Sequence, residues 1–204
     1  MSLFVTFEGG EGAGKSTQIA LLASALRERG VPFIETREPG GTPAGEAIRA
    51  LIMGEAAPDL SPLAQALLHS AARVQHVENR IDPALREGKA VLCDRFADST
   101  LAYQGYGMGL DQTELMALIR IGTRNRDPDM TFILDLPVEL GLSRARSQQY
   151  YEKLATDFHE RVREGFLEIA RHEPDRCVVI DATQTTAEVH RQIRQSVFDR
   201  LDLP

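Results

Sequence analysis

Short apolar runs alternate along the chain with longer segments in which apolar residues recur every three or four positions. The runs have the length and the β-branched and aromatic content of buried β-strands. They lie at positions 3–8, 32–36, 90–93, 131–136 and 177–181. Most are apolar throughout instead of alternating with polar residues, which is typical of strands that are covered on both faces.

The periodic segments between these runs predict helices over 15–29, 43–53 and 62–87. Gly30 ends the first helix, and Pro83 predicts a bend in the third. Further helices are expected after the last three strands. The alternation of strands and helices predicts an α/β fold with a parallel sheet of five strands and helices on both faces. In such a sheet, ligands bind beyond the carboxyl ends of the strands.

The domain organisation follows from the lack of internal repeats, low-complexity tracts and long linkers in the 204 residues. We therefore predict one domain over 1–204.

A hydrophobic content of 43% excludes a disordered chain. The net charge of −7 argues against nonspecific binding to nucleic acid or to an anionic membrane, although it leaves room for a local basic pocket. Of the basic residues, three are lysines and twenty are arginines. A GC-rich genome and a need for fixed phosphate contacts are both possible reasons.

The cysteines and the amino terminus indicate the cellular location. Cys93 and Cys177 each lie within an apolar run, so we expect both to be buried and unpaired, as in a reducing cytosol. No apolar run approaches the roughly 18 residues that span a bilayer. The first strand begins at once and leaves no room for a signal peptide. We predict a cytoplasmic protein.

A glycine-rich segment connects the first strand to the first helix. It matches G-x-x-x-x-G-K-[ST] in full and is followed by a threonine: Gly9-Gly10-Glu11-Gly12-Ala13-Gly14-Lys15-Ser16-Thr17. Between a strand and a helix, this pattern is typical of a loop whose amides bind phosphates. Lys15 then reaches the β- and γ-phosphates, and the Ser16 hydroxyl binds Mg²⁺. A glycine-rich turn without a ligand is the alternative to this nucleoside-triphosphate site.

Kinases, GTPase switches and ATP-driven motors all use such a loop. The sequence has no Asn-Lys-x-Asp string, with which GTPases read guanine; the nearest string, at 125–127, lacks the lysine and the spacing. Asp94 ends an apolar run, as a metal-side carboxylate does in motors, but Arg95 follows it directly. An arginine beside that carboxylate indicates a second anionic substrate. We therefore favour a kinase over a nucleotide-dependent switch or ATPase.

Four segments together resemble the thymidylate kinases, which phosphorylate dTMP with ATP. They are 8–17, Thr36-Arg37-Glu38-Pro39-Gly40-Gly41-Thr42, Ala71-Ala72-Arg73-Val74-Gln75, and the stretch 92–104. Their order and separations also match, and the similarity runs from about 3 to 182. The resemblance implies a P-loop kinase that uses ATP and Mg²⁺, converts dTMP to dTDP, and forms a homodimer. A kinase for a different nucleotide is the alternative enzyme.

The resemblance also assigns roles on the acceptor side. Arg95 would clamp the dTMP phosphate, Asp94 would lie near Mg²⁺ and the acceptor, and Arg49 would make a second phosphate contact. The remaining expected contacts are Glu11 to the sugar hydroxyl or a metal-bound water, Arg73 to the carbonyl edge of thymine, Tyr103 against the 2′ position of the sugar, and Ser99, Thr100 and Gln104 around the acceptor. Simpler roles compete for four of these residues: a surface salt bridge for Arg95, a strand-end cap for Asp94, a solvated helix face for Arg49 and a core aromatic for Tyr103.

The sequence departs from the family pattern at the acceptor base. His69 stands where a phenylalanine usually stacks on thymine. An imidazole ring can also stack, so we expect His69 to contact the base. A satisfied core histidine is the alternative, and Phe96 is a second candidate for the stacking ring.

A second departure concerns the lid, which we expect at about 144–153. It keeps two arginines, Arg144 and Arg146, but lacks the middle of the family's pattern. Two residues that are two positions apart on a helix point in different directions, so one arginine should be catalytic. We favour Arg146, which is nearer to the polar stretch of the lid, as a catalytic residue beside Lys15 and Arg95.

Overall fold

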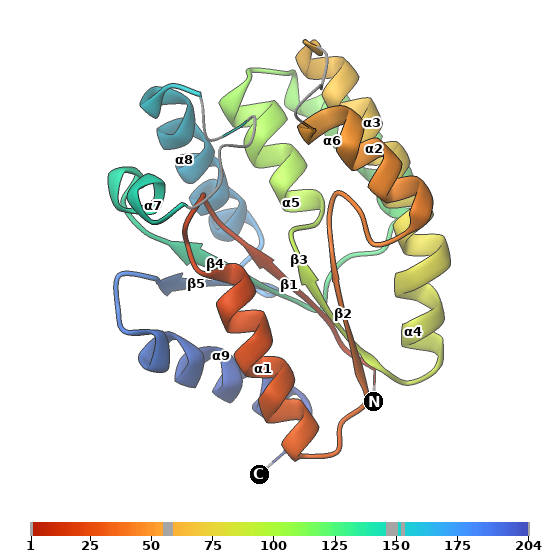
Figure 1. Cartoon of the computed structure of the whole chain (residues 1–204), viewed down its shortest axis with the longest axis vertical. Helices are drawn as coiled ribbons and strands as arrows, with labels where there is room; N and C mark the ends of the chain where they lie inside the picture. Colours follow the sequence, from red (N-terminus) through yellow and green to blue (C-terminus); the bar gives the residue numbers. More distant parts are fainter. Residues whose placement is uncertain (1, 55–58, 146–150, 152–153, 204) are drawn as a thin grey trace.

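A computed structural model describes residues 2–54, 59–145, 151 and 154–203 of the chain. Five parallel strands form one sheet in the order β2-β3-β1-β4-β5. The strands are β1 (Phe4–Glu8), β2 (Phe33–Arg37), β3 (Ala90–Asp94), β4 (Met130–Asp135) and β5 (Cys177–Asp181). Helices lie on both faces of this sheet (Figure 1). The predicted α/β fold is confirmed, and each strand end lies within one residue of its predicted position.

The register of the strands brings their carboxyl ends to one edge of the sheet. Phe7 of β1 lies beside Asp94 of β3 on one side and beside Phe132 of β4 on the other. Arg37, the last residue of β2, also lies beside Asp94. The segments that follow β1, β2 and β3 therefore begin close together, although long stretches of sequence separate them.

Alternate residues of the central strand face opposite layers of helices. On one face, α1 (Lys15–Glu28) and α9 (Thr186–Arg200) pack against Val5 and Phe7. On the other, Phe4 packs against Val77 and Ile81, and α8 (Thr156–His172) covers β4. Complete burial of each large apolar side chain contributes about 1.5–3 kcal/mol, so both layers hold the sheet in place.

The segment predicted as one helix over 62–87 contains a π-helical stretch. It consists of α3 (Pro62–His76), the π-helical η1 (Val77–Ile81) and α4 (Asp82–Arg86). The irregularity precedes Pro83 instead of lying at it. Proline has no N–H group to bond the carbonyl four residues back, and a π-turn accommodates that missing bond.

A second helical segment has the same construction and follows β3 directly. It joins α5 (Ala97–Thr100) to the π-helical η2 (Leu101–Gly107). The other described helices are α2 (Pro43–Met53), α6 (Gln112–Thr123) and α7 (Val138–Arg144). π-Helical turns occur frequently at functional sites. Here η2 follows α5 without a break and carries residues that line the cavity described below.

Both cysteines are buried and free, as predicted. Burial raises the pKa of the Cys93 thiol well above its usual value, and the neighbouring carboxylates add to the shift. The thiol is therefore protonated and unreactive at neutral pH. In the described part of the chain, no helix is both long enough and apolar enough to cross a membrane.

Candidate functional site

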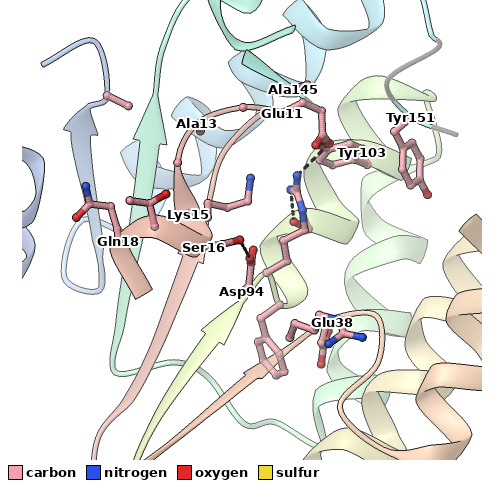
Figure 2. A pocket seen from close by; sticks show the side chains of 18 of the residues that line it. Glu11, Ala13, Lys15, Ser16, Gln18, Glu38, Asp94, Tyr103, Ala145 and Tyr151 are labelled. Atoms are coloured by element: carbon pink, nitrogen blue, oxygen red, sulfur yellow. Dashed lines mark hydrogen bonds and ion pairs between the residues drawn. The ribbon is translucent and has the colours of Figure 1, made fainter. Parts of the chain in front are cut away.

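A cavity of about 860 Å³ lies at the carboxyl edge of the sheet, and Figure 2 shows side chains that line it. It brings together Glu11–Thr17 of the glycine-rich loop and nine further residues predicted to contact substrates. These nine are Arg49, His69, Arg73, Asp94, Arg95, Ser99, Thr100, Tyr103 and Gln104. Gly9 and Gly10 lie outside its lining, at the start of the loop.

The glycine-rich loop needs glycine where the chain turns and where it approaches its neighbours. Gly9, Gly12 and Gly14 have φ values of 127°, 66° and 92°, in the region that favours glycine. A Cβ atom at Gly9 would collide with the carbonyl oxygen of Leu134 in β4, and one at Gly12 would collide with that of Gly141 in α7. The loop is thus held against two neighbouring elements, and α1 begins with its free amides at the cavity.

The ammonium group of Lys15 is buried in this loop. It donates hydrogen bonds to the carbonyl oxygens of Gly9 at 3.1 Å and Gly10 at 2.8 Å. Burial, together with the positive charge of Arg95, lowers the pKa of Lys15 to about 8. An anion in the loop would provide this ammonium with a better partner than the neutral carbonyls do.

Ser16 and Asp94 form a polar pair between the start of α1 and the end of β3. The Ser16 hydroxyl donates to a carboxylate oxygen of Asp94 at 2.8 Å. Within the described ranges, no group of three His, Cys, Asp or Glu residues could hold a metal ion. Mg²⁺ commonly binds through one or two protein oxygens, substrate phosphates and several waters. The donor set of one hydroxyl and one carboxylate fits that kind of site.

Arg95 is held in place by the main chain and by side chains around it. Its φ of 67° is unusual for a residue other than glycine. Its guanidinium donates to the Gly9 carbonyl oxygen at 3.1 Å, the Ser99 hydroxyl at 3.1 Å and the Glu11 carboxylate at 3.0 Å. It also lies 5.0 Å from the centre of the Tyr103 ring. The strained backbone aims this side chain at the phosphate loop.

Glu11 and Tyr103 lie on the far side of Arg95. The Tyr103 hydroxyl donates to Glu11 at 2.6 Å, on the same oxygen that accepts from Arg95. Although burial alone would raise it, the charges of Arg95 and Lys15 lower the pKa of Glu11 to about 2. The Tyr103 ring packs against aromatic rings of α8 and also lines the cavity.

Glu8, which ends β1, is a buried acid that sequence reasoning missed. It accepts from the Phe96 amide at 2.7 Å and from the Ser99 hydroxyl at 2.6 Å. Burial, with the nearby charge of Asp98, raises the pKa of Glu8 to about 7. The carboxylate ties both ends of the turn that contains Arg95. A glutamate at the end of a mostly apolar strand was the available sequence signal.

Arg49 in α2 faces the cavity from the side of β2. Its guanidinium donates to the carbonyl oxygen of Pro39 at 3.0 Å. Burial, together with the nearby charge of Arg37, lowers the pKa of Arg49. A half-buried arginine that lines the cavity differs from the solvated helix face considered above.

The other end of the acceptor side is formed by Arg73, Thr100 and Gln104. Arg73 is 1% exposed, and its guanidinium donates to the Thr100 hydroxyl at 2.9 Å. The Gln104 amide donates to the hydroxyl of Tyr151 at 2.9 Å. Phe96 lines the cavity but is only 1% exposed, because it packs in a T-shaped pair with Phe4 and the Arg73 guanidinium lies 5.3 Å from its ring centre.

His69 lines the same end of the cavity. Its Nε2 lies 3.2 Å from the Tyr151 hydroxyl. Burial and the neighbouring charge of Arg73 lower the pKa of His69 to about 3, so the ring is neutral at physiological pH. Both His69 and Phe96 line the cavity, and the stacking of either ring on a base stays a prediction.

Several segments close the end of the cavity beside α1, and of their residues only Arg144 was assigned a role from the sequence, as a lid arginine. Gln18 of α1 donates to the Thr186 carbonyl oxygen at 3.1 Å, which ties α1 to the start of α9. Arg144, at the end of α7, donates to the Ala182 carbonyl oxygen at 3.2 Å and lines the cavity. The segment between β5 and α9 supplies Gln184 and Thr185 to the lining. Arg146 lies outside the described residues.

Comparisons with known proteins place the chain in a family whose sequences and structure it matches. The family model for thymidylate kinase matches residues 7–193. The thymidylate kinase of Caulobacter vibrioides is 51% identical over 98% of both chains, and that of Thermomicrobium roseum is 54% identical over 90% of this chain and 88% of its own. The crystal structure of thymidylate kinase from Ehrlichia chaffeensis superposes with a TM-score of 0.79 at 37% identity, over 96% of this chain and 98% of that one. The chain belongs to the thymidylate kinase family, as its motifs predicted.

Proposed function

We propose that the protein transfers the γ-phosphoryl group of ATP to the phosphate of dTMP, giving ADP and dTDP. Phosphorylation of dTMP is the activity of the family to which the chain belongs. The observation that best supports the proposed arrangement is one cavity that contains both the phosphate loop and Arg95. A donor on the loop and an acceptor phosphate on Arg95 would face each other across it, as in-line transfer requires.

On the donor side, we assign the triphosphate to the loop amides and to Lys15. The ammonium group would exchange its two carbonyl partners for the β- and γ-phosphates. That exchange replaces neutral acceptors by charged ones, which make stronger hydrogen bonds. Lys15 would therefore bind the transferring group and stabilise its charge during the reaction.

Mg²⁺ bound with ATP would be held by the Ser16 hydroxyl and the Asp94 carboxylate, the pair that fits such a site. When bound, the ion neutralises phosphate charge and helps to orient the donor. Asp94 is adjacent in sequence to Arg95, so the same strand end would place both substrates.

On the acceptor side, the dTMP phosphate would replace Glu11 as a hydrogen-bond partner of Arg95. A phosphate dianion matches the guanidinium fork and carries more charge than a carboxylate. The acceptor oxygen is already ionised at neutral pH, so the reaction needs no strong general base. Glu11, released from Arg95, would then be free to accept from the sugar hydroxyl or from a metal-bound water.

A homodimer and a cytoplasmic location complete the proposal. Four large apolar side chains are 43–70% exposed on the neighbouring helices α2, α3 and α6: Leu51, Leu63, Leu67 and Ile121. These three helices lie together at one side of the molecule (Figure 1). A face of this kind suits contact with a second copy of the chain. Sedimentation of the parent and of Leu67→Glu tests it, because a charge there should shift a dimer toward monomer.

An acceptor panel tests the reaction. The assay measures ADP formation with ATP and dTMP, dUMP, AMP, CMP or GMP. Rapid turnover with dTMP is expected. A preference for another acceptor would indicate a kinase for a different nucleotide, and slow hydrolysis that no acceptor stimulates would indicate a switch or ATPase. Either of those two results contradicts the proposal.

A further inference from the structure

A chain of buried hydrogen bonds runs behind the acceptor end of the cavity, from β2 to α3. The Thr36 hydroxyl lies 2.6 Å from His76 Nε2, and His76 Nδ1 lies 2.9 Å from one carboxylate oxygen of Glu38. The other oxygen of Glu38 accepts from Arg73 Nε at 2.8 Å. The side chains of Arg73, His76 and Glu38 are 1%, 0% and 4% exposed. Water therefore contributes little to holding this chain together.

Arg73 is fixed from three directions. Besides Glu38, its Nη2 donates to the Phe96 carbonyl oxygen at 3.2 Å and to the Thr100 hydroxyl at 2.9 Å. Nη1 is buried and has no partner among the described residues. A buried donor without an acceptor is costly, and in native proteins it calls for an explanation. Because Arg73 lines the cavity, a carbonyl oxygen of a bound base is a suitable acceptor for Nη1.

The carboxylate of Glu38 can hold Arg73 only if its own rotation is fixed. His76 fixes it, because a carboxylate accepts and Nδ1 must therefore carry the proton that it donates. Thr36 in turn fixes the ring through Nε2. Both ring nitrogens of His76 thus have hydrogen-bond partners within the protein, and neither nitrogen faces the cavity.

The turn after β2 closes over this ring. Gly41 has a φ of 76°, and a Cβ atom there would lie 2.6 Å from His76 Nε2 and 2.7 Å from the Thr36 hydroxyl. The imidazole therefore cannot move toward the turn. A buried charge pair is seldom more stable than apolar side chains of the same size, so stability alone does not account for this arrangement. A need to orient the Arg73 guanidinium accounts for it.

We propose that His76 is a positioning residue for acceptor selection: through Glu38 it aims Nη1 of Arg73 at the base. The inference rests on the proposed function, in which the acceptor is dTMP. Thymine presents a carbonyl oxygen where cytosine presents an amino group. A guanidinium held rigidly satisfies the first and opposes the second, so the chain of bonds would favour dTMP over dCMP.

Two substitutions of the same residue separate the two ends of the ring. In His76→Asn, the amide nitrogen can take the place of Nδ1 and keep the bond to Glu38. In His76→Gln, the longer side chain can reach Thr36 in place of Nε2 and loses Glu38. Calorimetric titration of each variant with dTMP, dCMP and ATP measures the consequence, and steady-state kinetics separate KM from kcat.

His76→Gln should weaken dTMP binding about tenfold or more and narrow the preference for dTMP over dCMP, whereas His76→Asn should stay within about threefold of the parent. ATP affinity and kcat at saturating dTMP should change little in either variant. Equal dTMP binding by His76→Gln and the parent would overturn the inference. So would equal losses in both variants that extend to ATP, because they would show a merely structural role.

A double-mutant cycle and a second pair of variants guard the test. In an Arg73→Ala background, His76→Gln should cause no further loss of dTMP binding; an additive loss would show that His76 does not act through Arg73.

If thermal unfolding shows that His76→Gln does not fold, Thr36→Val and Thr36→Ser replace it. The valine variant should bind dTMP several-fold more weakly than the serine variant, which keeps the hydroxyl, and equal binding by the two would overturn the inference. Tight binding of a different acceptor by the parent would instead contradict the proposed function.

Discussion

The donor loop and the acceptor-base pocket are built in opposite ways. The loop takes nine consecutive residues, 9–17, and its binding groups are mostly main-chain amides. The base pocket takes single side chains from separate segments, among them Glu38 after β2, Arg73 on α3 and Thr100 at the end of α5. In the proposed assignment, the phosphate binds to a local backbone shape, whereas the base contacts side chains that only the fold brings together.

The cations of the two regions are held differently as well. Lys15 is bonded to two neutral carbonyls, which a phosphate can replace. Arg73 is bonded to a buried carboxylate and two further acceptors, so substrate binding need not move it. Arg95 is intermediate, because its partner Glu11 is 19% exposed at the edge of the cavity. The cations assigned to the phosphates thus have partners that a substrate can replace, whereas the cation assigned to the base is held by a buried carboxylate.

The largest expected effect is that of Lys15→Ala. Loss of the charge that meets the β- and γ-phosphates should reduce kcat roughly 10³-fold or more, while the loop keeps its fold. Single-turnover kinetics together with thermal unfolding measure both. Near-normal turnover with an unchanged melting temperature would contradict the assignment of the loop as the donor site.

Arg95→Ala should weaken dTMP binding while it spares ATP. The loss of a bidentate, charge-assisted contact is expected to cost about 2–5 kcal/mol where the partner charge is desolvated. Arg95→Lys is the matched control, because it keeps a charge but lacks the planar fork. Separate titrations with dTMP and ATP decide the matter: loss of ATP affinity with intact dTMP affinity would place Arg95 on the donor side.

Arg146→Ala tests whether a lid arginine adds a third cation. We expect kcat to fall by roughly 10²-fold with small changes in both KM values, since a supplied arginine acts on the transition state. Arg144→Ala should do less, because that guanidinium already donates to the Ala182 carbonyl oxygen. Parent-like turnover in both single variants and in the double variant would locate the charge elsewhere.

Tyr103→Ala should narrow the preference for deoxyribose over ribose by roughly tenfold without abolishing activity. The ring is expected to fill the space that a 2′-hydroxyl would need, so its removal relieves a clash. Tyr103→Phe keeps the ring and loses the hydroxyl that bonds to Glu11, and it should therefore keep the preference. The ratio of kcat/KM for dTMP and its ribose analogue is the measurement, and an unchanged ratio in the alanine variant would leave Tyr103 a packing residue.

The smallest expected effect is a pH dependence of ATP affinity. Burial lowers the pKa of free Lys15 to about 8, and a bound triphosphate favours the charged ammonium, so binding raises that pKa. Affinity is then full below pH 8 and falls as the pH rises above it, by about fivefold between pH 8 and 9. Titrations across this range should show the fall in the parent and none in Lys15→Met. A flat profile in the parent would mean that the free ammonium stays charged.

Much of the fold could be predicted from local pattern. The apolar runs located all five strands to within one residue, and the helix predicted over 43–53 matches α2 at both ends. The irregular helix was only partly foreseen: Pro83 marked a disturbance, but the structure places it at 77–81. A proline removes a bond to a carbonyl further back in the helix, so its effect appears before it in the chain.

What the residues determined by themselves was the part of the site that is contiguous: the phosphate loop, and the Asp94–Arg95 pair at a strand end. Their chemistry depends on neighbours in the chain, so spacing alone reveals it. The more distant residues of the cavity, such as Arg49 and Arg73, were predicted only from the family resemblance. The tertiary structure decided the rest. Glu8 acts on the turn of Arg95 across about ninety residues, and Glu38 joins His76 to Arg73 across more than thirty. No local pattern encodes such contacts, because it is the parallel register of β1, β2 and β3 that brings their carboxyl ends to one edge and buries these groups together.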